Sequence, residues 1–217
     1  MQIISSVIKR LCLFLVTALL VGSVHATPAA NGDMLEKYRQ AFKNSAYPIK
    51  YIFVDANGEN RDGSCCSSDV PKKIYMVNIL AKESSEFIYS PEVNRLIKQD
   101  FEITIDDKSI ISMPKADYLI LRMSRPPEYN PKSAGCAAGM GEDRAYLIAI
   151  KNNGISVLNR NFFNCSGSYR MVHVNGQPGY EIRDYKKGSD QAQSVLYILQ
   201  DGQLVRKENG PYKEAAQ

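Results

Sequence analysis

Apolar and polar residues alternate along much of this chain, most regularly between residues 101 and 106. Phe101, Ile103 and Ile105 are apolar there, and the residues between them are polar. A period of two residues is typical of a β-strand that packs one face inward and leaves the other in water. We therefore predict a strand with one solvated face at this position.

Strand patterns follow one another closely in the second half of the chain. They cover residues 118–123, 146–150, 155–161, 169–174, 180–185 and 195–199. The dipeptides that separate neighbouring segments are Asn153-Gly154, Asn175-Gly176 and Asp201-Gly202. Asparagine, aspartate and glycine tolerate the positive φ that tight hairpin turns require. The second half is therefore predicted to be mainly antiparallel β-sheet, and Asn57-Gly58 marks a further turn after a strand at 51–54.

Two short helices are predicted in the N-terminal half. Asp33 is a suitable N-cap for the first, and Ser90 followed by Pro91 is a typical start for the second. The residues at helical spacing are Leu35, Tyr38 and Phe42 in the first helix and Val93, Leu96 and Ile97 in the second. Together with the strands, they predict an α+β fold that is predominantly antiparallel sheet.

Polar, glycine-bearing stretches at 55–72 and 125–144 are predicted to be irregular loops. Asp106-Asp107 lies between alternating segments and lacks the spaced oxygen ligands of a calcium loop. We interpret this pair as a turn rather than as a metal site.

The N-terminus resembles a cleavable signal peptide. Lys9 and Arg10 precede an apolar run at 11–21, and short side chains before Ala26 suit cleavage there. The alternative is an uncleaved anchor, although the run is shorter than a typical membrane span. We expect a signal peptide at 1–26, a flexible leader at 27–32, one domain at 33–208 and a flexible tail at 209–217. No later segment is long and apolar enough to span a membrane, so a periplasmic or secreted location is expected.

Removal of the signal peptide leaves four cysteines: Cys65, Cys66, Cys136 and Cys165. In an oxidising compartment they are expected to form two disulfides, for which three pairings exist. A Cys65–Cys66 bridge closes a strained ring between adjacent residues. We favour Cys136–Cys165, which would join the base of a hairpin. Zinc is disfavoured because no Cys-x-x-Cys pair occurs, and no metal is predicted.

Composition and charge argue against several classes of protein. The 217 residues are 44% hydrophobic and 23% charged, which is ordinary for a globular protein. Removing Lys9 and Arg10 lowers the formal net charge from +4 to +2, and the remaining charges are dispersed. Such a balance gives no support to nucleic-acid binding. Residues 139–144 lack the third glycine of a dinucleotide loop and the Lys-Ser/Thr end of a P-loop, so no cofactor is predicted.

Once the signal peptide is removed, His173 is the only histidine left as a candidate catalytic base. The chain contains no Gly-x-Ser-x-Gly nucleophile motif. One alternative function is therefore an envelope hydrolase that combines His173 with Asp143 or Ser166.

The leading hypothesis is binding. A loop fixed by a disulfide would present Met140, Glu142, Asp143 and Arg144 to a partner with little ordering cost. Tyr129, in a proline-stiffened loop, would add an aromatic contact, unless it anchors that loop to its own sheet. The tyrosines inside apolar strands, predicted to lie in or near the core, are Tyr118, Tyr146, Tyr180 and Tyr197.

These features favour an exported noncatalytic binding protein of the bacterial envelope. An inhibitor or immunity-type protein that binds another protein fits this description. Besides the hydrolase, the sequence leaves open a small-ligand-binding periplasmic protein.

Overall fold

A computed structural model describes residues 32–45, 49–61, 73–81, 87–127, 136, 141–165, 167–185 and 192–211. The predictions for the signal peptide, Cys65, Cys66, Tyr129, Met140 and Ser166 fall outside these residues. Neither helix within these ranges has the length and apolar character that crossing a membrane requires.

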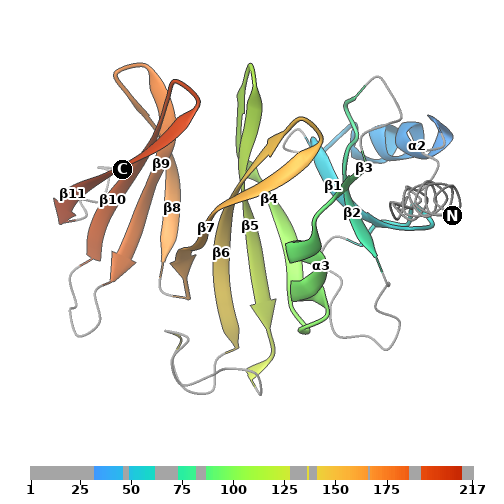
Figure 1. Cartoon of the computed structure of the whole chain (residues 1–217), viewed down its shortest axis with the longest axis horizontal. Coiled ribbons are helices and arrows are strands. Elements are labelled where there is room, and N and C mark those ends of the chain that lie inside the picture. The colour runs from blue at the N-terminus through green and yellow to red at the C-terminus, as the bar shows by residue number, and fades with distance from the viewer. Residues whose placement is uncertain are drawn as a thin grey trace, which may run out of the picture.

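Three antiparallel sheets and two helices make up the fold (Figure 1). The first sheet has the order β1-β2-β3, with β1 at Tyr51–Asp55, β2 at Ile74–Asn78 and β3 at Phe87–Tyr89. The central sheet has the order β4-β5-β6-β7, formed by Glu102–Met113, Ala116–Arg125, Glu142–Lys151 and Gly154–Asn164. The third has the order β11-β10-β9-β8, formed by Gln203–Pro211, Ala192–Gln200, Gln177–Tyr185 and Ser168–Val174. The predicted α+β class is confirmed, but β2 and β3 were not predicted and the strands divide into three sheets.

Both faces of the central sheet are covered (Figure 1). One face packs on the first sheet and on α3 (Pro91–Ile97), and its core includes Phe53, Leu121 and Ile148. The other face packs on the third sheet through Leu147 and Tyr180. Helix α2 (Gly32–Phe42) covers the outer face of the first sheet. The solvated face predicted for β4 is consequently wrong in part, because the polar residues of 102–106 are half-buried.

A bulge interrupts β4 where the sequence predicted a turn. The pairing with β5 shifts between Asp106 and Ile111. Within the bulge, the Ser109 hydroxyl accepts the amide hydrogen of Ile120 at 2.7 Å and donates to the carbonyl oxygen of Asp106 at 2.6 Å. The Tyr180 hydroxyl donates to the Ser109 carbonyl at 2.8 Å. Ser109 replaces ladder hydrogen bonds, so the strand continues through the bulge instead of reversing.

Four two-residue turns lie at the same end of the central and third sheets, which we call the turn end (Figure 1). The predicted turns Asn175-Gly176 and Asp201-Gly202 are confirmed, and all four of their residues have positive φ. The turn between β6 and β7 is Asn152-Asn153, one residue before the predicted position. Pro114-Lys115, which was not predicted, joins β4 to β5.

The predicted start of α3 is confirmed. The Ser90 side chain accepts the amide hydrogen of Val93 at 3.2 Å, and Pro91 occupies the first turn. The buried Asn94 side chain exchanges two hydrogen bonds with the backbone of Ile74, which ties α3 to β2. The packing of α3 is thus fixed by polar contacts as well as by its apolar face.

Two predicted boundaries differ from those observed. Helix α2 begins at Gly32, so Asp33 lies in its first turn and Gly32 does not belong to a leader. Strand β11 continues to Pro211 and includes the first three residues of the predicted tail. Pairing with β10 at Ser194 and Gln193 holds these last residues.

Candidate functional site

A disulfide closes the end of the β6–β7 hairpin opposite its turn. Cys136 precedes β6 and Cys165 follows β7, and their Cα atoms lie 5.3 Å apart. This confirms both the favoured pairing and its place at the base of a hairpin. We call Cys136, Cys165, Arg125 and residues 142–144 the disulfide end.

Glu142 is a buried ion-pairing residue at the start of β6. Its side chain is 3% exposed, and the Nε of Arg125 donates to its Oε2 at 2.5 Å. Nη2 of Arg144 contacts the other carboxylate oxygen. Arg125 is the cross-strand partner of Glu142, while Arg144 follows it by two residues and shares its face. The prediction that Glu142 belongs to an irregular loop is therefore wrong.

The two arginines at Glu142 also cover one aromatic ring. Their guanidinium carbons lie 4.5 Å (Arg125) and 5.0 Å (Arg144) from the ring centroid of Phe101, which is buried. Cation–π attraction adds to the ion pairs and orients both guanidinium groups. Both arginines share the single carboxylate of Glu142, and the Arg144 side chain remains 31% exposed.

A second arginine cluster occupies the opposite face of the central sheet. The Nε of Arg122, on β5, lies 2.9 Å from Oδ2 of Asp106 on β4. Its guanidinium group lies over the rings of Phe163 and Tyr169, at 5.4 and 5.9 Å. Burial and the neighbouring Asp106 carboxylate raise the pKa of Tyr169. Tyr169 is therefore a neutral hydrogen-bonding and stacking group at physiological pH.

Asp143 lies on the same face as Arg122 and is exposed. Its carboxyl group is nevertheless partly desolvated by neighbouring atoms, which raises its pKa, and this effect outweighs the opposing influence of Arg122 and of the backbone amide of Arg144. The adjacent acids Glu142 and Asp143 thus occupy different environments on opposite faces of β6. Among the predicted contact residues that the structure describes, Asp143 and Arg144 reach solvent.

A cleft of about 660 Å³ opens beside the Arg122 cluster, between the edge strands β4 and β8. Its lining combines charged, aromatic and apolar groups from Ser45, Ile49, residues 104–108, Arg122 and residues 169–171. Arg170 contacts the buried carboxylate of Glu181, so this cation is positioned before any ligand arrives. Met171 is 38% exposed and belongs to the lining. The volume falls within the range of small-molecule pockets.

The candidate base His173 is exposed on β8. It pairs across the hairpin with Pro178, two residues before the turn at Asn175. Asp143 belongs to a different sheet. In the part of the chain that the structure describes, no ion pair joins His173 to an acid, and no group of three His, Cys, Asp or Glu residues is placed to hold a metal.

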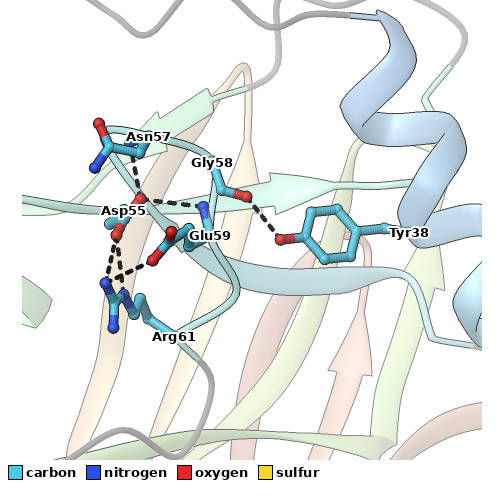
Figure 2. Close-up of polar contacts among 6 residues, drawn as sticks. All are labelled: Tyr38, Asp55, Asn57, Gly58, Glu59 and Arg61. Carbon is cyan, nitrogen blue, oxygen red and sulfur yellow. Dashed lines mark hydrogen bonds and ion pairs between the residues drawn. The ribbon is translucent and has the colours of Figure 1, made fainter.

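The loop after β1 is ordered around one buried carboxylate, that of Asp55. Figure 2 shows Asp55 accepting the backbone amide of Asn57 at 2.8 Å and the Nε of Arg61 at 2.9 Å. The Tyr38 hydroxyl, from α2, donates to the carbonyl of Gly58 at 2.6 Å. Burial would raise the pKa of Asp55, but these hydrogen bonds prevail and lower it. Residues 55–61 therefore form a fixed turn instead of an irregular loop, and their polar contacts serve the fold.

The tyrosines predicted to lie in or near the core do so. Tyr118, Tyr146 and Tyr180 are buried, and Tyr197 is half-buried against the core between the central and third sheets. The Tyr118 hydroxyl donates to the carbonyl of Gly202 at 2.8 Å, which joins these two sheets. These side chains therefore serve mainly to pack the sheets together.

Comparison of the chain with protein-family models, with curated proteins and with solved structures finds no match.

The sequence identified part of this site. Glu142, Asp143 and Arg144 lie beside Cys136 and Cys165, as expected. Sequence analysis missed the arginines and aromatic residues that complete the site: Phe101, Arg122, Arg125 and Tyr169. The available signal was Arg122, which is the one charged residue within the otherwise apolar run at 118–123.

Proposed function

We propose that this chain is an exported, noncatalytic binding protein that engages another protein through the cleft between β4 and β8. The observation that supports this proposal is that two arginines of the cleft are already fixed by ion pairs, and that an exposed apolar side chain lines the same cleft. Arg122 is held by Asp106, Arg170 by Glu181, and Met171 is exposed between the two strands. Groups that are positioned in advance lose little conformational entropy on binding.

The edge position of β8 indicates how a protein segment would bind. In an antiparallel pair, alternate residues direct their backbone groups away from the neighbouring strand. An extended segment of a partner can add to such an edge through main-chain hydrogen bonds while its side chains enter the adjacent cleft. Acidic and basic groups in the lining would select a segment that carries both signs of charge.

Export is supported by two features of different kinds. Residues 1–26 have the pattern of a signal peptide. The Cys136–Cys165 disulfide is typical of proteins in oxidising compartments. A periplasmic or secreted inhibitor or immunity-type protein combines these features with a preorganised binding surface.

Site-specific photo-cross-linking tests the proposal. A benzophenone amino acid replaces Met171 in the full chain, and the matched control carries it at Leu158, which is similarly exposed on β7. We expect one defined protein adduct from position 171 in cells and none from position 158. The adduct should weaken when Arg122→Ala is added, since this change removes a charge from the cleft. Equal adduct patterns from both positions would reject the cleft as the binding surface.

A second candidate, binding of a small ligand, is favoured by the volume of the same cleft. The two candidates are distinguished by size of the bound species. Native mass spectrometry of protein purified from the envelope would show a mass increase below that of any protein if a small ligand occupies the cleft.

A further inference from the structure

The turn end contains a lysine whose charge is already neutralised. The ammonium of Lys50 lies 2.6 Å from Oδ2 of Asp117 and donates to the Ser112 hydroxyl at 3.1 Å. The Tyr51 hydroxyl donates to the same Asp117 carboxylate. Burial would raise the pKa of Asp117, but hydrogen bonds from Lys50, Tyr51 and Ser112 prevail and lower it. Asp117 is therefore ionised and committed to its neighbours.

A pocket of about 250 Å³ lies over this network. Two hairpin turns line it, Pro114-Lys115 from β4–β5 and Asn152-Asn153 from β6–β7. Lys115 and Lys151 both line the pocket and are exposed, and neither makes an ion pair with any residue that the structure describes.

The balance of charge in this pocket favours an anion. Three lysines and one aspartate line it, which leaves a formal charge of +2 after Asp117 neutralises Lys50. Asn152 and Asn153 add side-chain amides that can donate hydrogen bonds. The ammonium groups and amides supply donors from both turns. Lysine is a common partner of phosphate, which it contacts as a point charge.

A larger cleft of about 570 Å³ also borders the Pro114-Lys115 turn. It shares Lys115 and Lys151 with the small pocket and adds Tyr118 and Gln203. An anionic group between the lysines would therefore have room for the rest of a larger molecule beside it.

We propose that Lys115 and Lys151 form a binding site for a phosphate group at the turn end. This site is separate from the proposed protein-binding cleft, because the two pockets share no lining residue. A negative result for phosphate binding therefore does not count against protein binding at the cleft, and the reverse also holds. The phosphate group can belong to a small soluble compound or to a lipid headgroup.

Titration at constant ionic strength tests this site. Amide chemical shifts of the isotope-labelled protein are followed as inorganic phosphate is added, and sedimentation with phosphatidylglycerol vesicles tests the lipid source. The test variant carries Lys115→Gln and Lys151→Gln, and the matched control carries Lys37→Gln, an exposed lysine of α2. Exposed charge pairs contribute roughly 1 kcal/mol at most. We therefore expect up to about fivefold weaker binding per lysine, and about 25-fold for both.

Saturable shifts at Asn152 and Asn153 that weaken in the double variant and persist in Lys37→Gln support a site for small phosphate compounds. Vesicle binding with the same dependence on variants supports a lipid headgroup. The proposal is overturned if neither probe binds, or if Lys37→Gln weakens binding as much as the double variant does.

Discussion

The two ends of β6 hold their charges in different ways. At the disulfide end, Arg125 and Arg144 pair with the buried Glu142 and stack on an aromatic ring. At the turn end, Lys115 and Lys151 are exposed and form no ion pair among the residues described. A charge that is buried and paired is needed by the fold, whereas an exposed lysine contributes little to folding. The comparison separates residues that build the scaffold from residues that remain available to a ligand.

The largest effect is expected when the carboxylate of the disulfide end is removed. Glu142→Gln leaves Arg125 and Arg144 without their buried counter-charge. We expect the free energy of unfolding to fall by about 3–5 kcal/mol, the usual cost of removing one partner from a buried ion pair. Urea unfolding followed by circular dichroism measures this loss.

Asp143→Asn is the matched control, since it changes the adjacent carboxylate. The pKa of Asp143 is raised in the folded state, so its ionised form is not stabilised there. We expect a change within about 0.5 kcal/mol, as for most surface substitutions. Equal losses in Glu142→Gln and Asp143→Asn would contradict the distinction between the two faces of β6.

Loss of the disulfide should have the next largest effect. Cys136→Ser combined with Cys165→Ser opens a loop closed over a sequence separation of 29 residues. Loop-closure entropy predicts a loss of about 3–4 kcal/mol. The thermal midpoint of the double variant should match that of the reduced wild type, and a midpoint equal to that of the oxidised wild type would show that the bridge does not stabilise the fold.

Asp117→Asn should have a smaller, pH-dependent effect. This change removes the acceptor shared by Lys50 and Tyr51, and we expect a loss of about 1–3 kcal/mol at pH 7. The pKa of Asp117 is lowered on folding, so its stabilisation is present above pH 3.8 and disappears as the pH falls through the folded-state value. The difference between wild type and variant should therefore shrink below pH 4.

Asp201→Asn is the control for this pH series, since Asp201 is an exposed turn residue at the same end and asparagine tolerates its positive φ. Urea unfolding at pH 7 should give a difference within about 0.5 kcal/mol for this variant, as for most surface substitutions. A difference for Asp117→Asn that does not shrink as the pH falls would contradict the assigned role of its carboxylate.

The smallest effect is expected for Lys115→Gln combined with Lys151→Gln. In the absence of ligand, the free energy of unfolding should change by less than about 0.5 kcal/mol. A loss above about 2 kcal/mol would show that these lysines build the fold and would remove the contrast between the two ends.

The sequence predicted those elements that are governed by local signals. Alternation located most strands of the second half, and Ser90-Pro91 located the start of α3. Turn dipeptides located the hairpins at Asn175 and Asp201, where positive φ is required. These signals act within a few residues, so one sequence is enough to detect them.

The missed features depend on contacts between distant residues. Strand β3 has only three residues, too few to display a period. Glu142 followed a glycine-bearing loop, and its burial depends on Arg125 across the sheet. The Asp106–Asp107 bulge depends on Ser109 replacing backbone partners. None of these contacts leaves a pattern within a short window of sequence.

Peptide mapping without reduction, on protein recovered from intact cells, tests the central claim most directly. That claim is an exported scaffold cross-linked by a disulfide between Cys136 and Cys165. The account predicts a mature N-terminus at Thr27 and a cross-linked pair of peptides that contain Cys136 and Cys165. A chain that begins at Met1 with both of these thiols free would contradict it.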